Sequence, residues 1–155
     1  MSDSIIINRE DLTGEAAVWL IQALNAELSA TYPEPGATHF RLDPEETKEG
    51  RGTFLVARVD GVPMACGAIR KNDDETVEIK RMYVAPEARG QGLSRRVLSA
   101  LEAEAARLNV KRIVLETEPR QHAAIALYER SGFQRIPAFG EYIGSPMSIC
   151  MEKRL

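Results

Sequence analysis

The chain has 155 residues, of which 44% are hydrophobic and 28% charged, and its formal net charge is -3 at pH 7. These values are typical of one globular domain, here residues 1–155, and they argue against disorder and, because the balance is acidic, against nucleic-acid binding. No apolar run reaches the roughly 18 residues of a membrane span, and the two cysteines lack metal-ligand spacing, so we expect a reduced, cytoplasmic protein with no metal site and no membrane partner.

The N-terminal region predicts a strand followed by an amphipathic helix. Residues 5–7 form the strand, and Thr13 is the expected helix cap. Apolar residues then recur at helical spacing and are expected in the core, together with Trp19. They are Ala17, Leu20, Ile21, Leu24 and Leu28. Prolines end this helix, and residues 33–52 predict a long loop.

An antiparallel meander is predicted for the middle of the chain. Strands are expected at residues 53–59, 62–70 and 76–84. The dipeptide Asp60-Gly61 between the first two is a strong two-residue hairpin signal.

The last part of the chain alternates helices with strands. Residues 93–108 and 123–131 predict helices, and residues 112–117, 133–136 and 147–153 predict strands. The long helix would link two parallel strands by a right-handed crossover. The element order therefore predicts an α+β domain on a mixed sheet.

Charge is divided unevenly between the two halves of the chain. Residues 1–75 carry seven basic and 14 acidic side chains, and residues 76–155 carry 13 basic and nine acidic ones. This division favours an anionic ligand on the second half and a cationic one near the first. An uneven spread of solvated surface charge would explain the same counts.

A glycine-rich loop precedes the long helix and carries the clearest chemical signal. It reads Arg89-Gly90-Gln91-Gly92-Leu93-Ser94-Arg95. Glycines let a ligand approach the backbone, and the first amides of a helix have no intrahelical acceptor, so the loop predicts a phosphate site. A P-loop is excluded because no Gly-Lys-[Ser/Thr] follows, and a dinucleotide fingerprint is disfavoured because Arg95 stands at its third glycine.

Two segments resemble the GNAT superfamily of acyl-CoA-dependent N-acyltransferases. The family signature [Arg/Gln]-x-x-Gly-x-[Gly/Ala] corresponds to residues 89–94, where Ser94 replaces the final small residue. Residues 121–133 resemble the family pattern Asn-x-x-Ala-x-x-x-Tyr-x-x-x-Gly-Phe, where Gln121 replaces the asparagine. The resemblance implies a GNAT-like, mostly antiparallel sheet of six or seven strands with helices on both faces.

The resemblance also implies how acetyl-CoA would bind as co-substrate. Backbone groups of Met82, Tyr83 and Val84 would hold the pantetheine arm, which enters where the strands 76–84 and 112–117 splay apart. The pyrophosphate would bind the amides of the loop together with a basic side chain. The residues implied for this contact are Arg89, Gly90, Gln91, Gly92, Leu93, Ser94 and Arg95, with Gln121 nearby.

Two residues are implied for proton transfer. Tyr128 matches the family tyrosine that faces the thioester sulfur, with a core tyrosine among apolar neighbours as the less favoured alternative. Glu78 matches the position of a glutamate base in parts of the family, with a salt bridge to Lys80 as the structural alternative. Strand alternation predicts that Glu78, Lys80 and Met82 share one face.

Other reactive side chains carry weaker signals. Glu116 and Glu118 end a strand near the splay, where they would recognise a cationic substrate or remain solvated. The histidines, His39 and His122, have no support from spacing. Cys66 and Cys150 have no activating partner visible in the sequence, which disfavours an acyl-cysteine route.

The function predicted from these features is N-acetyl transfer from acetyl-CoA to a primary amine of a small molecule, by direct attack in a ternary complex. Acceptor groups are expected from residues 28–52 and 139–144, and four acidic residues would suit a cationic amine. They are Glu34, Asp43, Glu45 and Glu46. Acylation of a protein terminus or aminoacyl-tRNA, and a non-catalytic acyl-CoA-binding module, are the alternatives. The resemblance is also compatible with a homodimer.

Overall fold

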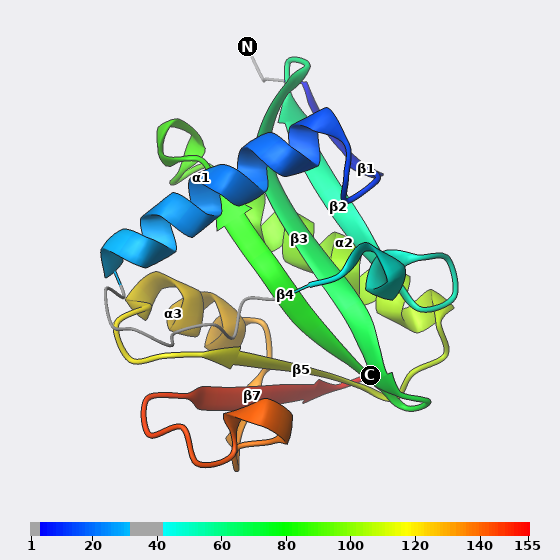
Figure 1. The fold of residues 1–155 in the computed structure, drawn as a ribbon, viewed down its shortest axis with the longest axis vertical. Coiled ribbons are helices and arrows are strands. Elements are labelled where there is room, and N and C mark those ends of the chain that lie inside the picture. Colours follow the sequence, from blue (N-terminus) through cyan, green and yellow to red (C-terminus); the bar gives the residue numbers. More distant parts are fainter. Residues whose placement is uncertain (1–3, 32–41) are drawn as a thin grey trace.

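A computed structural model describes residues 4–31 and 42–155 of the chain (Figure 1). Seven strands form one open sheet in the order β1-β2-β3-β4-β5-β7-β6. The strands are β1 Ile5–Arg9, β2 Gly52–Val59, β3 Val62–Asp73, β4 Thr76–Val84, β5 Arg112–Thr117, β6 Gln134–Ile136 and β7 Ile149–Arg154. The helices are α1 Glu15–Thr31, α2 Leu93–Arg107 and α3 His122–Arg130, with 3-10 turns η1 Pro44–Thr47, η2 Pro86–Ala88 and η3 Gly140–Tyr142.

Helices cover both faces of the sheet, so the predicted fold class is confirmed. In Figure 1, α1 crosses one face of strands β2 to β4, and α2 lies behind them. The buried residues form two clusters: Leu20 and Leu24 of α1 pack with Phe54 of β2 in one, and Val97 and Leu101 of α2 contribute to the other. We call the two surfaces of the sheet the α1 face and the α2 face. In the described parts of the chain, no helix combines the length and the hydropathy of a membrane span.

The predicted meander is confirmed, with one strand longer than expected. Asp60 and Gly61 have φ values of 50° and 85°, as the predicted two-residue hairpin turn requires. β3 continues past the predicted end at residue 70, because Asp73 pairs with Thr76 of β4. The polar residues after 70 are therefore mostly strand.

Two expectations for the first helix are wrong. Thr13 does not cap it, because α1 begins at Glu15 and the Thr13 hydroxyl donates to the Asp11 carboxylate over 2.6 Å. Trp19 is not a core residue, because its exposed fraction is 48%. Residues Ala16, Ala17, Leu20 and Leu24 form the buried stripe, and Trp19 lies about 100° around the helix from Leu20.

A β-bulge in β4 changes which side chains share a face. Cys66 pairs with Tyr83 and Ala68 with Lys80, so one residue of β3 lies opposite two of β4. Arg81, one of those two, has a φ of 61°. The extra residue shifts the alternation, so Met82 packs with the α2-face cluster while Tyr83 packs with the α1-face cluster.

The bulge overturns the prediction that Glu78, Lys80 and Met82 share a face. Val77 and Ile79 belong to the α2-face cluster, so the alternate residues Glu78 and Lys80 point to the α1 face. Met82 packs against the α2-face cluster. It lies under Gly67, where an added Cβ would come within 2.6 Å of the Met82 sulfur. Gly67 is therefore required by the close approach of the bulged strand.

β4 and β5 are the parallel pair at the centre of the sheet, and they separate early. They pair only from Thr76 with Arg112 to Glu78 with Val114. The remaining residues of β4, up to Val84, have no ladder partner on β5. The expected splay is therefore present, and Glu78 lies at its apex. Of the residues predicted in the long loop, Glu34 and His39 lie outside the described residues.

Candidate active site

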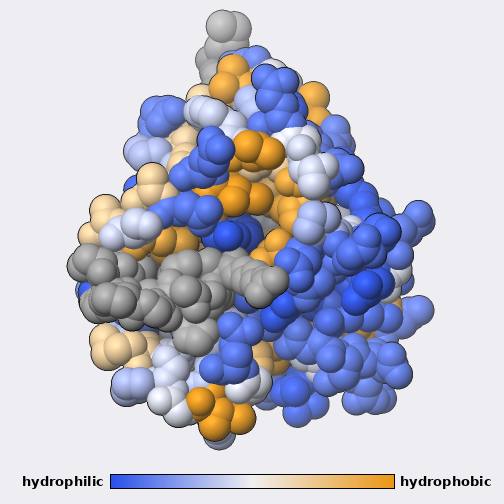
Figure 2. Space-filling model, in the orientation of Figure 1, coloured by the Kyte–Doolittle hydropathy of each residue, from blue (hydrophilic) through white to orange (hydrophobic). Residues whose placement is uncertain are grey.

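A cavity of about 1030 Å³ passes through the splay between β4 and β5. It runs from the loop before α2, past α3, to the C-terminal end of α1 and residues 145–148. Figure 2 shows this side of the molecule, with a hollow bordered by hydrophobic side chains. Residues from both faces of the sheet therefore line the cavity.

Backbone amides form the end of the cavity at α2. Within the described residues, the amides of residues 90–95 donate to no protein acceptor, and the first helical bond here runs from the Arg96 amide to the Gly92 carbonyl. Gly90 and Gly92 both have a φ of 79°. A Cβ added at either glycine would meet no atom within 4 Å, so the backbone is open to a ligand. Six unpaired amides at a helix N-terminus fit a phosphate group.

The predicted basic residues of this loop have different surroundings. The Arg89 side chain donates from Nε to the Val84 carbonyl over 2.9 Å and forms an ion pair of 2.7 Å with Glu27 of α1. Its guanidinium thus ties the loop to β4 and α1. Ser94 lines the cavity, whereas Arg95 is exposed and does not. Gln91 is also exposed outside the cavity lining.

The wall between the loop and the apex comes from β4. Met82, Tyr83 and Val84 all line the cavity. The bulge places the Met82 side chain on the α2 face and Tyr83 on the α1 face, so the strand presents its backbone to the cavity between them. Burial raises the pKa of the Tyr83 phenol.

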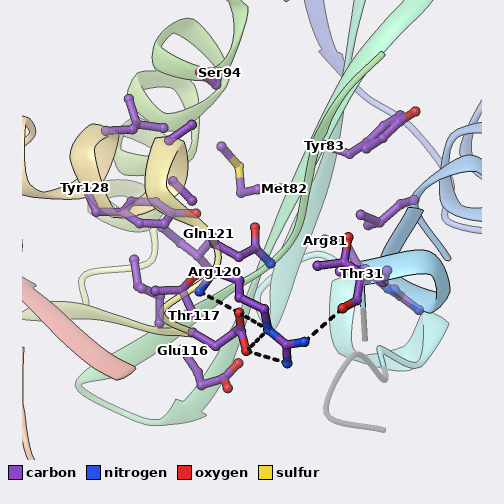
Figure 3. A pocket seen from close by; sticks show the side chains of 18 of the residues that line it. Thr31, Arg81, Met82, Tyr83, Ser94, Glu116, Thr117, Arg120, Gln121 and Tyr128 are labelled. Atoms are coloured by element: carbon purple, nitrogen blue, oxygen red, sulfur yellow. Dashed lines mark hydrogen bonds and ion pairs between the residues drawn. The ribbon is translucent and has the colours of Figure 1, made fainter. Parts of the chain in front are cut away.

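Tyr128 and Gln121 enter the cavity from α3. Tyr128 is 5% exposed, packs edge-on against Phe133 at 5.5 Å between ring centroids, and its hydroxyl points into the cavity toward Met82 (Figure 3). Within the described residues this hydroxyl makes no hydrogen bond. Burial raises the pKa of the phenol, so Tyr128 retains its proton at neutral pH. Gln121 lines the cavity at the N-terminus of α3.

Glu78 lies at the apex of the splay, but beneath the cavity surface. Its exposed fraction is 2%, and it is not among the lining residues. Asn72 donates to Oε1 over 3.1 Å, and the Tyr142 hydroxyl donates to Oε2 over 2.5 Å. Lys80 Nζ lies 4.0 Å from the same Oε2. The predicted salt bridge with Lys80 is thus one contact of a larger cluster.

The cluster around Glu78 has two members that do line the cavity, Tyr142 and Lys80. Lys80 Nζ donates to the Tyr142 hydroxyl oxygen over 3.4 Å and lies 6.0 Å from the centre of its ring. Burial lowers the pKa of Lys80, and the charge of Glu78 offsets part of that effect. We call Glu78, Lys80 and Tyr142 the apex cluster.

A partly buried ion pair supports the apex cluster from the protein side. Arg70 Nη2 lies 3.4 Å from Glu78, and its Nη1 donates to Glu46 of η1 over 2.5 Å. Burial tends to raise the pKa of Glu46, but the Asp43 amide and Arg70 outweigh it and hold the pKa below its usual value. Glu46, which the sequence suggested for a cationic acceptor, is therefore already bound to Arg70.

The mouth of the cavity is bridged by Arg120. Its guanidinium pairs with Glu118 at 2.9 Å and donates to the carbonyl of Thr31, the last residue of α1, over 3.0 Å (Figure 3). Glu116 also lines the cavity and accepts a 2.8 Å hydrogen bond from the Ser148 hydroxyl. His122 is a lining residue as well.

Sequence reasoning included Tyr142 in the segment 139–144 expected near the acceptor and paired Lys80 with Glu78, but it did not connect Tyr142 to Glu78. That contact spans 64 residues, and no pattern in the sequence predicts it. Arg120 was not found by sequence reasoning.

The cysteines lie outside the site. Cys66 is fully buried, and burial raises the pKa of its thiol to about 12. Burial also raises the pKa of Cys150. Neither lines the cavity, and a thiol with a raised pKa is a poor nucleophile at neutral pH.

Comparison with known proteins agrees with this geometry. A family model described as "Acetyltransferase (GNAT) family" matches residues 20–133. The IAA acetyltransferase of Azospirillum brasilense is 37% identical over 153 residues, covering 98% of this chain and 99% of the relative. A crystal structure described as an acyl-CoA N-acyltransferase of Klebsiella pneumoniae superimposes with a TM-score of 0.82 at 36% identity, covering 97% of each chain. The PaiA N-acetyltransferase of Thermoplasma acidophilum, solved with coenzyme A, shares the fold with a TM-score of 0.74 at 17% identity, covering 98% of this chain and 99% of that one.

Proposed function

Because this chain belongs to the acetyltransferase (GNAT) family and is an acyl-CoA-dependent N-acetyltransferase, we propose that it moves the acetyl group of acetyl-CoA to a primary amine of a small molecule. One observation carries the proposal. The amides of residues 90–95 have no acceptor among the described residues, and four of these residues line one end of a cavity that continues through the splay toward a buried carboxylate. A donor with phosphates at one end and a reactive acyl group at the other fits that arrangement.

The cofactor end of the cavity fits acetyl-CoA, which supplies an activated acetyl thioester. The amides of residues 90–95 would bind the pyrophosphate, and the backbone of residues 82–84 would hold the pantetheine arm. Gln121, from the N-terminus of α3, would contact the cofactor. Arg89 contributes by fixing the loop through Glu27 and Val84 rather than by direct contact.

Two proton transfers are assigned to two buried groups. Tyr128 donates a proton to the departing sulfur, because its protonated hydroxyl points into the cavity and has no other acceptor within the described residues. Glu78 receives the proton that the amine loses, because it is the carboxylate at the apex of the splay. Direct attack in a ternary complex needs no thiol nucleophile, in keeping with the buried cysteines.

A small-molecule acceptor is supported by the name of the Azospirillum brasilense relative, which covers nearly the same length. Of the acidic residues expected to attract a cationic amine, Asp43 and Glu45 are exposed, but Glu46 is bound to Arg70. Glu116 lines the cavity on β5 and is the better candidate for this attraction. A homodimer stays a prediction.

Thermal unfolding with and without acetyl-CoA tests the cofactor assignment, with NADH and ATP as controls. A ligand at 100 times its Kd adds about 2.7 kcal/mol to the free energy of unfolding, which raises the Tm by roughly 5–10 °C for a chain of this size. We expect this rise with acetyl-CoA alone. No rise at saturating acetyl-CoA would refute the assignment.

Release of CoA with a panel of primary amines tests the reaction. Small amines should support turnover, and a denatured protein or an aminoacyl-tRNA should not. A chain that binds acetyl-CoA and releases no CoA with any amine would instead be a binding module.

A further inference from the structure

Glu78 has no direct access to the cavity, so a proton from the acceptor amine must reach it through another group. Among the described residues, the side chains that both contact Glu78 and line the cavity are Tyr142 and Lys80. Lys80 is a donor with no acceptor capacity in its ammonium form, so it cannot take up a proton. Tyr142 donates to Glu78 over 2.5 Å, and a phenol oxygen can take up one proton while it gives up another.

The position of Tyr142 relative to Tyr128 is what the reaction requires. Tyr128 packs in the α2-face cluster, on the side of α2 and α3. Glu78 and Lys80 point to the opposite face, and Tyr142 meets them there. The two tyrosines therefore line the same cavity from opposite sides of the splayed strands. If the amine approaches the thioester from the α1 face, where Tyr142 lies, the thioester sulfur would lie on the side of Tyr128.

We propose that Tyr142 is a catalytic residue that accepts the proton of the attacking amine and passes its own proton to Glu78. This inference rests on the proposed function and deepens it. As the bond between the amine nitrogen and the acetyl carbon forms and the carbon–sulfur bond breaks, the amine N–H proton moves to the Tyr142 oxygen. The Tyr142 hydroxyl proton moves to Oε2 of Glu78, and Tyr128 supplies the proton that the sulfur gains. Exchange with solvent then returns one proton to Tyr128 and removes one from Glu78.

Neighbouring groups favour this transfer. The Lys80 ammonium, 3.4 Å from the Tyr142 oxygen, stabilises negative charge that develops there during the exchange. Asn72 and Arg70 hold the other carboxylate oxygen of Glu78, so Oε2 stays directed at Tyr142. The hydrogen bond between Tyr142 and Glu78 Oε2 is therefore held in a fixed orientation, as proton transfer along it requires.

Tyr142→Phe tests the proposal, because it removes only the hydroxyl. With an amine that the wild-type chain acetylates, we expect kcat to fall by roughly a hundredfold, within the usual range for loss of a general base. The KM for acetyl-CoA and the rise in Tm that acetyl-CoA causes should stay as in the wild type. Glu78→Gln should lower kcat by a similar factor, and the double variant should lose no more than either single one.

Phe139→Leu is the matched control for a purely structural role. Phe139 packs edge-on against Tyr142 at 5.2 Å between centroids, so the change loosens the same turn and leaves the polar atoms in place. We expect kcat within about threefold of the wild type. If Tyr142→Phe lowers kcat no more than Phe139→Leu does, the proposal is wrong.

Glu116→Gln tests whether Glu116, a carboxylate that lines the cavity, is the general base in place of Glu78. A larger loss of kcat in Glu116→Gln than in Tyr142→Phe would overturn the relay and assign the base to Glu116. If the Tyr142 variant does not fold, Glu78→Gln decides: unchanged kcat overturns the relay, because the relay ends on Glu78. A wild-type chain that acetylates no amine would refute the proposed function instead, because that result is obtained before any variant is compared.

Discussion

The two ends of the cavity are built in different ways. The end at α2 presents backbone amides from six consecutive residues, 90–95, whose geometry follows from two glycines and a helix N-terminus. The apex of the splay presents side chains from β4 and η3, held by an ion pair from β3 and η1. A backbone site tolerates many side chains and needs a particular conformation, whereas a side-chain cluster needs particular residues and a particular tertiary structure. Under the proposed function, the amide end binds the cofactor and the apex faces the acceptor amine.

The largest expected effect tests the backbone end. Gly92→Val places a branched side chain in the open space at a φ of 79° and covers amides that would bind phosphate. Loss of two charge-assisted hydrogen bonds of about 1.5 kcal/mol each weakens acetyl-CoA binding by roughly a hundredfold. Calorimetric titration with acetyl-CoA measures the Kd.

Gly61→Val is the control for backbone strain at the same kind of position. Gly61 has a φ of 85°, also with no atom within 4 Å of an added Cβ, and lies in the β2–β3 hairpin away from the cavity. It should lower the Tm about as much as Gly92→Val and leave the Kd unchanged. Equal Kd values for both glycine variants and the wild type would refute the amide site.

The second prediction concerns Tyr128, which belongs to neither end. Tyr128→Phe removes the hydroxyl that faces the cavity, and we expect kcat to fall by roughly a hundredfold with little change in the KM for acetyl-CoA. Steady-state assays of CoA release measure both constants. The Tm should not fall, because within the described residues the hydroxyl makes no hydrogen bond to lose. A variant with wild-type kcat would mean that Tyr128 has only a packing role.

The third prediction tests the bulge that joins the two ends. Gly67→Ala puts a Cβ 2.6 Å from the Met82 sulfur and 2.9 Å from Val97 Cγ1. Overpacking of this kind costs roughly 1–3 kcal/mol of the free energy of unfolding. Urea denaturation should show it, and the KM for acetyl-CoA should rise as Met82 and the adjoining backbone shift. Unchanged stability would mean that β4 relaxes without cost.

The smallest expected effect tests the ion pair behind the apex cluster. The pKa of Glu46 is held below its usual value, so the folded chain binds fewer protons there than the unfolded chain. The resulting stability is fully present above the usual glutamate pKa of about 4.3 and is lost as the pH falls through the lower folded value. Glu46→Gln should therefore cost less than about 1 kcal/mol at pH 7, and the difference from the wild type should shrink as the pH falls below the usual glutamate pKa of about 4.3. Urea titrations over this pH range measure it, and a difference that does not shrink on acidification would contradict the assignment.

Much of the fold was predictable because its signals are local. The hairpin at Asp60-Gly61 and the phosphate loop each depend on a few consecutive residues whose conformational preferences are strong. The apolar periodicity of α2 was equally clear, and its buried residues include Leu93, Val97 and Leu101. Tyr128 could be singled out because its segment has a fixed spacing on one helix.

Other features could not be read from local patterns. The face of the sheet to which Met82 points depends on the bulge at Arg81. That bulge is stabilised by packing against Gly67 and α2, which the strand sequence alone does not indicate. The exposure of Trp19 depends on which stripe of α1 meets the sheet. Arg89 matched a phosphate motif, but Glu27, 62 residues away, occupies its guanidinium.

The sequence by itself determined the order of the strands and helices and the backbone of the cofactor loop, because these depend on residues that are neighbours in the chain. Only the tertiary structure decided how Glu78 connects to the cavity. Its bond to Tyr142 spans 64 residues, and the Arg70–Glu46 pair behind it spans 24. Side chains so far apart meet only when the sheet and its connecting turns have formed, since no local preference encodes their contact.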